Sequence, residues 1–162
     1  MAITRLENSR WGFDSNCFVC EARNPGGLQV PFFHDADTDT VFADFTLDEV
    51  FSGAPMYVHG GITLALLDEA AAWAAIAVGG KFAVTHTTTT TFERPVRIGV
   101  PYRVEARLLD QTKERITTTT EVRDVAEKIR ARNVAEFVVL GEAQAIDAIG
   151  ENISGPTTDY LR

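Results

Sequence analysis

The stretch over residues 60–78 is the part of the sequence that most constrains the fold of this chain. Two glycines open it, and the run that follows is apolar on almost every side except for Asp68 and Glu69 near its centre. A helix that is apolar all round is normally buried. A carboxylate inside such a helix is costly unless it is paired or used chemically. The sequence therefore predicts one long, buried helix that carries an acid with a role.

Composition is typical of an ordinary globular protein with a single domain. The 162 residues are 45% hydrophobic and 23% charged, enough to build one substantial core. The formal net charge of −8 and the pI of about 4.8 argue against a general nucleic-acid-binding surface. An anionic small ligand is compatible with this charge, because a few local arginines can outweigh the overall sign.

We expect neither a targeting segment nor a membrane span in this chain. Residues 1–11 lack the basic start and apolar centre of a signal peptide. The long apolar run carries Asp68 and Glu69, each of which would cost several kcal/mol in lipid. Two cysteines without an export signal are typical of a reducing compartment. The expected location is therefore the cytoplasm.

Strand patterns lie on both sides of the predicted helix. They cover residues 28–33 and 41–47 before it, and residues 82–92, 102–110, 116–122 and 129–140 after it. Short turns between the later strands predict antiparallel hairpins, and one helix can cover one face of such a sheet. We therefore expect an α+β fold in which an antiparallel sheet wraps around one long central helix.

The two ends of the chain are expected to lie outside this unit. Residues 1–16 are interpreted as an irregular lead-in and residues 150–162 as a loose tail. The predicted organisation is an N-terminal arm with a Cys-x-x-Cys segment over residues 1–26, one domain over residues 27–141, and a C-terminal tail over residues 142–162.

The start of the helix carries the motif of a known family. His59-Gly60-Gly61 is followed, nine residues after the histidine, by Asp68. This arrangement resembles the hotdog-fold acyl-CoA thioesterases of the phenylacetate-pathway (PaaI-like) type, and the resemblance covers residues 27–140. It implies a hotdog fold, hydrolysis of an acyl-CoA to free acid and CoA, and a homodimer or dimer of dimers. It implies no metal or other cofactor.

Two further motifs support the resemblance. The Phe-Glu-Arg-Pro sequence at residues 92–95 is similar to the end of the strand that follows the helix in this family. Counting back from that proline, Thr85 falls where many relatives carry a Ser or Thr that assists the catalytic acid. The Asn-Cys-Phe-Val-Cys sequence at residues 16–20, with residues 24–28, resembles the N-terminal signature of one bacterial branch.

Two positions depart from the family pattern. Some relatives carry, six residues before the histidine, an Asn that contacts the thioester or the water, and here that position is Gly53. The branch signature has Gly after its second cysteine, where this chain has Glu21. The first departure leaves open which group positions the water.

The residue types at the motif suit thioester hydrolysis. Backbone N–H groups of Gly60 and Gly61, at the positive end of the helix dipole, can stabilise a developing oxyanion. Asp68 would act as a general base on water or as the nucleophile of a transient anhydride, and the sequence leaves both roles open. The resemblance implies that Thr85 assists Asp68. His59 would fix the loop and help to bind the carbonyl or the leaving thiol.

The spacing along the helix predicts a site shared between two subunits. Asp68 lies seven or eight residues beyond the glycines, which at 1.5 Å per residue is about 11–12 Å along the axis. A thioester carbonyl and its attacking group must come within about 3–3.5 Å of each other. We therefore expect Gly60 and Gly61 from one subunit to act together with Asp68 and Thr85 from its partner.

Each of these residues also has a purely structural interpretation. Asp68 could bond a backbone group or an arginine, His59 could be a loop histidine, and Thr85 one more strand threonine. Glu69 points about 100° away from Asp68 on the helix. It is expected to be a structural or interface acid, with support of the active site as the alternative.

Three more residues are candidates for contacts with the substrate. Arg94 and Arg97 flank the proline at a strand end and could bind the phosphates of CoA. Solvated or ion-paired surface arginines are the alternative. Trp73, a little more than one turn beyond Asp68, could limit the depth of an acyl pocket or belong to the core.

The Cys17-x-x-Cys20 pair suggests zinc or redox chemistry. A zinc site needs four ligands, and beside this pair the chain offers three histidines, at positions 34, 59 and 86. A redox motif should follow a strand and open a helix, and this pair is predicted to do neither. We therefore expect a structural N-terminal segment without a metal.

Two functions fit the sequence. The first is an acyl-CoA thioesterase, favoured by the acid at position 68. The second is a non-catalytic acyl-CoA-binding or sensor protein on the same scaffold, with which Gly53 is compatible.

Overall fold

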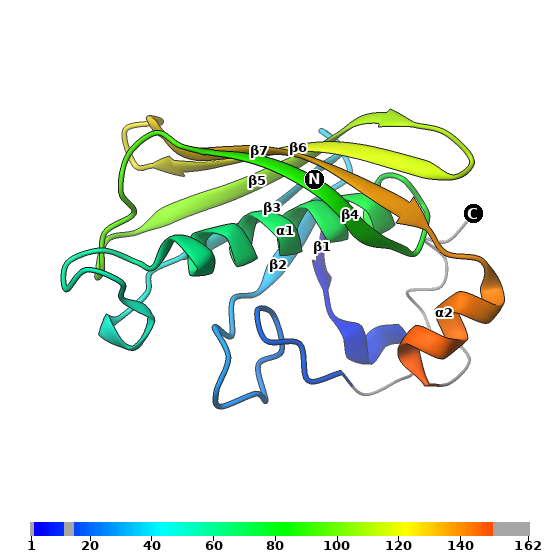
Figure 1. Ribbon diagram of the computed structural model, residues 1–162, viewed down its shortest axis with the longest axis horizontal. Coiled ribbons are helices and arrows are strands. Elements are labelled where there is room, and N and C mark those ends of the chain that lie inside the picture. Colours follow the sequence, from blue (N-terminus) through cyan, green and yellow to red (C-terminus); the bar gives the residue numbers. More distant parts are fainter. Residues whose placement is uncertain (1, 12–14, 151–162) are drawn as a thin grey trace.

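One antiparallel sheet lies against one long helix (Figure 1). The computed structural model describes residues 2–11 and 15–150. Within them the strands run in the order β1-β2-β3-β5-β6-β7-β4. Their bounds are β1 Ile3–Leu6, β2 Phe32–Asp35, β3 Thr40–Phe45, β4 Ala83–Phe92, β5 Tyr102–Gln111, β6 Arg115–Asp124 and β7 Ile129–Val139. The helices are α1 Gly60–Ala77 and α2 Glu142–Ile149, with short 3-10 turns at Asn8–Trp11 and Glu49–Phe51.

The core lies between α1 and the face of the sheet that it covers (Figure 1). Leu66 and Leu67 of α1 are fully buried. They share one cluster with the fully buried strand residues Val41, Ala43, Val104, Ala106, Val122 and Ala131. A second cluster joins Ile116 and Phe137 to Ala71 and Ala75 of α1. This alternation of buried and more exposed residues confirms the predicted antiparallel sheet around a central helix.

The helix α1 ends where the sequence predicts, within one residue. A Cβ atom at Gly79 would lie 2.5 Å from the carbonyl oxygen of Ala75 and 3.0 Å from Cδ1 of Ile116. Gly80 has a φ of +69°, in the left-handed region that favours glycine. The helix therefore stops because only a glycine fits against its last turn.

By length and composition α1 could also cross a membrane. Half of the apolar segment Gly60–Ala77 is buried inside the protein, and α1 packs against six of the strands. The core helix of a globular protein has these same properties, so its apolar character is accounted for by the fold.

The N-terminal region is more ordered than the sequence predicted. Residues 1–16 were expected to be irregular, but β1 pairs with β2 in the register Ile3↔Asp35 to Leu6↔Phe32. The strand expected over residues 28–33 is shifted to Phe32–Asp35. The N–H groups of Leu28 and Val30 bond instead to Phe18 and Val19, and Gln29 has a φ of +55°. Residues 28–30 therefore dock on an earlier loop and not on the sheet.

The segment predicted as a C-terminal tail begins with a helix. α2 occupies Glu142–Ile149 and ends at Gly150, which has a φ of +87°. Most of the loose tail expected over residues 150–162 lies outside the described residues.

The strand β4 forms one edge of the sheet. Its ten residues pair with β7 on one side, and within the described chain no strand pairs with its other side. Eight of the ten residues are exposed, from Val84 to Thr89 and at Thr91 and Phe92. Proteins normally cover or shorten a long exposed edge, so this strand is suited to pairing with another chain.

The packing of α1 predicts a large loss of stability when its core face is truncated. Leu66→Ala removes a fully buried side chain, so the free energy of unfolding should fall by about 2–5 kcal/mol. Leu109→Ala is the matched control, because Leu109 is 61% exposed and its loss should cost no more than about 0.5 kcal/mol. Urea denaturation followed by circular dichroism measures both. Equal losses for the two variants would contradict the assigned core.

Candidate functional site

His59 organises the start of α1. It is the residue that precedes the helix, and its Nδ1 accepts a hydrogen bond of 2.9 Å from the N–H of Gly61. Its carbonyl oxygen accepts from Ile62 and Thr63, and its own N–H donates to Phe51 over 2.9 Å. The predicted role of His59 in fixing the loop agrees with these four bonds.

The two glycines differ in what their N–H groups can offer. The N–H of Gly61 is engaged by His59, whereas the N–H of Gly60 has no partner among the described residues. Both glycines are exposed at the positive end of the helix dipole. Gly60 therefore offers a free N–H donor at the start of the helix, and Gly61 offers one only if the His59 ring turns away.

An open depression of about 370 Å³ lies beside this loop. It is lined by Val50, Phe51, Ser52, His59, Gly61 and Ile62. The position where relatives carry an Asn is close by, but a Cβ atom at Gly53 would come within 3.3 Å of the Cα of His59. An Asn at this position would therefore press on the His59 backbone as this chain places it.

Asp68 and Thr85 are in direct contact. The hydroxyl of Thr85 donates a hydrogen bond of 2.8 Å to Oδ1 of Asp68, joining β4 to the middle of α1. Asp68 is half-buried, so its carboxylate is accessible at the surface of the single chain. The structure thus brings together two residues that the sequence separates by 17 positions.

A β-bulge allows Thr85 to face α1. The register of β4 against β7 shifts between Thr85 and Thr87. Beyond the bulge, Thr88 accepts a hydrogen bond of 3.1 Å from Nδ2 of Asn133, a buried residue of β7. Side chains alternate along a strand, so without the extra residue Thr85 and Thr88 would point to opposite faces. The bulge therefore aims Thr85 at Asp68.

The glycine loop and Asp68 stay apart within one chain. α1 is continuous from Gly60 to Ala77, so the rise per residue keeps the two about 11–12 Å apart along the axis. One substrate carbonyl cannot reach both groups of a single chain. The prediction of a site shared between two subunits depends on this separation, and the continuous helix maintains it.

The other predicted contacts lie away from this pair. Trp73 is 2% exposed and belongs to the main core cluster. Arg94 and Arg97 are exposed, and the guanidinium of Arg97 lies 5.5 Å from the centre of the Tyr57 ring. Their roles toward substrate stay predictions.

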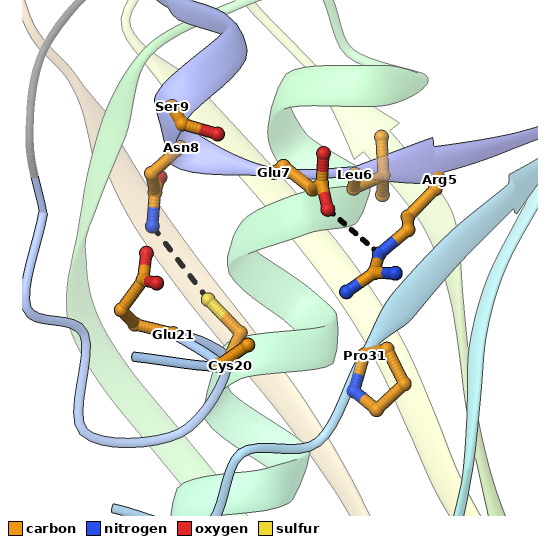
Figure 2. Close-up of a pocket in the computed structure, with 9 residues that line it drawn as sticks. Arg5, Leu6, Glu7, Asn8, Ser9, Cys20, Glu21 and Pro31 are labelled. Carbon is orange, nitrogen blue, oxygen red and sulfur yellow. Dashed lines mark hydrogen bonds and ion pairs between the residues drawn. The ribbon is translucent and has the colours of Figure 1, made fainter. Parts of the chain in front are cut away.

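A small cavity of about 40 Å³ lies between the N-terminal segment and the loop that carries Cys20 (Figure 2). Nδ2 of Asn8 points across it toward Sγ of Cys20 at 3.6 Å. The ion pair between Arg5 and Glu7, 2.8 Å long, lies at its other side.

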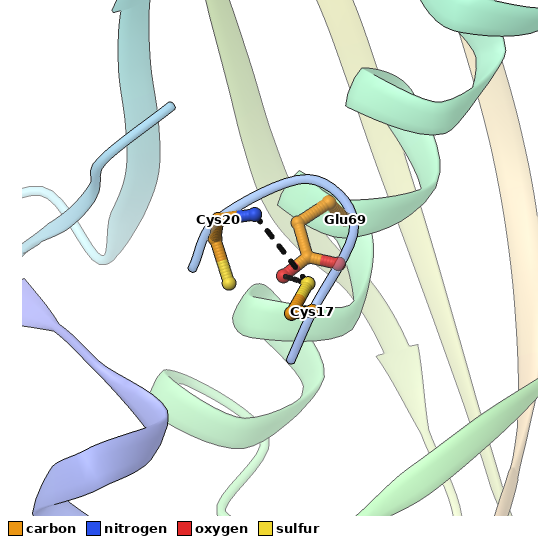
Figure 3. Close-up of side chains that lie close together, drawn as sticks. All are labelled: Cys17, Cys20 and Glu69. Atoms are coloured by element: carbon orange, nitrogen blue, oxygen red, sulfur yellow. Dashed lines mark hydrogen bonds between the residues drawn. The ribbon is translucent and has the colours of Figure 1, made fainter. Parts of the chain in front are cut away.

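Glu69 meets both cysteines, which sequence reasoning did not foresee. Sγ of Cys17 lies 3.3 Å from Oε1 of Glu69, and the N–H of Cys20 donates to Sγ of Cys17 over 3.4 Å (Figure 3). The loop of residues 17–20 and the helix lie 52 positions apart in sequence, so only the fold could join them. Two sequence features could have indicated this contact if they had been considered together: the acid in an apolar helix and the Cys-x-x-Cys pair.

The cluster perturbs its own protonation. Burial raises the pKa of Glu69 to about 8. Hydrogen bonding to the Cys20 side chain lowers the pKa of Cys17 to about 5, and the same contact raises the pKa of Cys20. Each of the three groups therefore affects the protonation of the other two.

Comparisons with known proteins agree with this architecture. Residues 56–130 match the family model described as the thioesterase superfamily. A crystal structure described as a thioesterase superfamily protein is 27% identical with a TM-score of 0.65, over 71% of this chain and 57% of that one. The match thus spans less than two thirds of that relative. No curated protein sequence matches the chain.

Two further solved structures share the fold. The Escherichia coli PaaI protein from the phenylacetic acid degradation operon is 23% identical with a TM-score of 0.59, over 64% of this chain and 74% of that one. A Streptococcus mutans protein bound to acetyl CoA is 16% identical with a TM-score of 0.60, over 64% and 82%. The sheet order, the central helix and these matches identify the hotdog fold, and residues 56–130 of this chain are similar to the thioesterase superfamily.

Proposed function

We propose that this protein is an acyl-CoA thioesterase, which hydrolyses an acyl-CoA to the free acid and CoA. The hydrogen bond from Thr85 to Asp68 is the observation that carries the proposal, because it holds an accessible carboxylate in the middle of an apolar helix. A fold neighbour bound to acetyl CoA supports the substrate class.

The proposed reaction uses groups from two subunits. The Gly60 N–H of one subunit binds the thioester oxygen and stabilises the oxyanion that develops there. Asp68 of the other subunit takes a proton from water, whose oxygen attacks the carbonyl, and the proton then passes to the departing thiolate. In the alternative route Asp68 attacks directly, and water later cleaves the anhydride. Thr85 holds the carboxylate in either case.

Two independent features support a homodimer. The length of α1 keeps Gly60 and Asp68 of one chain too far apart to act on one carbonyl, and β4 offers ten residues whose other edge is unpaired among the described strands. We propose that β4 strands of two copies lie edge to edge, and that such dimers can associate further into a tetramer.

Further parts of the proposal concern ligand contacts and location. Arg94 and Arg97 are exposed in the segment that follows β4, and they would bind the phosphates of CoA. Trp73 would limit the acyl chain from within the core. Both cysteines are free thiols, which supports a reducing cytoplasm as the place of action.

A non-catalytic acyl-CoA-binding or sensor protein is the second candidate. It is favoured by Gly53 in place of the relatives' Asn and by the Gly61 N–H already being bonded to His59. Tight binding of acyl-CoA by calorimetry, without release of CoA, would identify this function.

Asp68→Asn tests the proposed chemistry. The amide keeps the shape but can neither take a proton nor attack, so kcat should fall by about 10²–10⁴-fold. Release of CoA from short, medium, long and aryl acyl-CoAs is followed with a thiol reagent. Asp110→Asn, an exposed acid on β5, is the matched control and should act like wild type. Equal CoA release by the Asp68 variant and wild type would refute the role of Asp68.

Thr85→Val tests the positioning of Asp68. Loss of one hydrogen bond to a charged group is worth about 1.5–3 kcal/mol, so kcat should fall by about 10- to 100-fold while KM changes little. Thr85→Ser keeps the hydroxyl and should restore most of the rate. Thr89→Val, on the same strand, is the control. A purely structural threonine would instead show a stability loss with kcat unchanged.

Mixed dimers test whether the site is shared. Gly60→Pro removes the proposed donor, and proline is tolerated at the first position of a helix. Each variant alone, Gly60→Pro or Asp68→Asn, should be inactive. Random mixing of the two by co-refolding should restore about a quarter of the activity, because half of the dimers then hold one intact site.

Light scattering on the same samples gives the mass of the assembly. Activity that stays absent in verified mixed dimers would mean that both groups act within one chain or that one of them plays no role. A monomeric active protein would contradict the shared site directly.

A further inference from the structure

Three side chains that the proposed reaction does not use form a compact donor set. Sγ of Cys17, Sγ of Cys20 and a carboxylate oxygen of Glu69 all lie within 4.8 Å of one another. Sγ of Cys17 and Oε1 of Glu69 are 3.3 Å apart. Figure 3 shows the three side chains converging between the N-terminal loop and α1.

The loop that carries the cysteines is held independently of them. Backbone N–H groups of Leu28 and Val30 donate to Phe18 and Val19, the two residues between the cysteines, over 2.8 and 2.9 Å. A Cβ atom at Gly27 would lie 2.5 Å from the carbonyl oxygen of Phe18, so the chain passes closely there. Contacts that do not involve the two sulfurs therefore help to hold the backbone between the cysteines.

Glu69 has no cation to balance it. It lies in α1, and within the described residues neither an arginine, a lysine nor a histidine pairs with its carboxylate. Its hydrogen-bond contacts are with the cysteines. A buried carboxylate is normally paired, hydrogen-bonded or bound to a metal. Two sulfurs and one carboxylate that pairs with no described basic side chain make a suitable set of ligands for a cation.

The donor types and distances fit zinc. With Zn–S near 2.3 Å and Zn–O near 2.0–2.2 Å, a tetrahedral site places its ligand atoms about 3.5–3.8 Å apart. The 3.3 Å between Cys17 and Glu69 is slightly below that range, and the other two separations are no longer than 4.8 Å. Thiolate ligands favour zinc over the hard cations magnesium and calcium. Three protein ligands leave a fourth position for a water.

The surroundings offer room and a partner for that water. The cavity of about 40 Å³ beside Cys20 exceeds the volume that one water needs (Figure 2). Asn8, whose amide faces Sγ of Cys20 at 3.6 Å, can bond a water there or the sulfur itself. Such outer contacts orient metal ligands and strengthen binding.

We propose that Cys17, Cys20 and Glu69 form a zinc-binding site that ties the N-terminal loop to α1. Binding of the divalent ion displaces the protons still carried by the three ligands, so the two thiolates, the carboxylate and the ion together hold a charge of −1. The site lies one residue from Asp68 and supplies no group to hydrolysis. Its role is to fasten residues 17–20 to the helix, independently of the function proposed above.

The test measures metal binding by the full-length, fully reduced and metal-stripped protein. Co²⁺ is titrated first, and we expect one equivalent to give a thiolate-to-metal charge-transfer band with the visible bands of tetrahedral cobalt. Zn²⁺ should then displace it with one equivalent per chain. Zinc should also raise the melting temperature, because it binds the folded state.

Variants identify the ligands. Cys20→Ser should roughly halve the charge-transfer intensity, since one thiolate remains. Glu69→Gln should weaken Zn²⁺ binding by at least about tenfold, because even the loss of an outer contact costs about 10- to 100-fold. Glu21→Gln is the matched control, as Glu21 lies beside Cys20 but pairs with Arg23. Cys17→Ser serves as a second ligand variant if the Glu69 variant does not fold.

The outcomes separate the possible roles. Absence of a thiolate band in the reduced protein would overturn the proposal, as would Glu69→Gln and Cys17→Ser variants that bind zinc like wild type. Loss of two hydrogens by mass on mild oxidation, without any metal binding, would identify the pair as a redox dithiol instead. CoA release is assayed separately, so failure of the metal site leaves the proposed hydrolysis intact, and the reverse also holds.

Discussion

The burial of α1 against the sheet is the interaction on which the rest of this structure depends. The helix is apolar on nearly all sides, and its leucines and alanines pack against four long strands. Full burial of a leucine-sized side chain contributes about 1.5–3 kcal/mol, so this single contact region dominates the core. It also fixes where every group of the candidate site lies, because Gly60, Asp68 and Glu69 all belong to this one helix.

The helix α1 holds several chemically active groups at different positions along its length and on different faces. Its N-terminal end presents the free N–H of Gly60, its middle presents Asp68 to Thr85, and the next residue faces the cysteine loop. Adjacent helix positions point about 100° apart, which explains how Asp68 and Glu69 meet different partners on different segments. The proposed dimer and the proposed zinc site are two consequences of this division.

The sequence predicted the fold well where the pattern was local and repetitive. The helix was placed within one residue of its end, and the four later strands lie close to their predicted positions. The prediction failed at β1 and at residues 28–31, whose patterns are short. There the pairing is decided by contacts between distant segments, such as the hydrogen bonds from Leu28 and Val30 to residues 18 and 19.

The sequence by itself determined the distance between the glycines and Asp68, because the rise of a helix per residue does not depend on its surroundings. It also determined that the acid would be set in an apolar helix. Only the tertiary structure decided which groups meet there. A bulge of one residue turns Thr85 toward Asp68, the ring of His59 engages one glycine and leaves the other free, and Glu69 reaches two cysteines 52 and 49 positions away. These contacts depend on how separate elements pack, and no periodicity within either element encodes them.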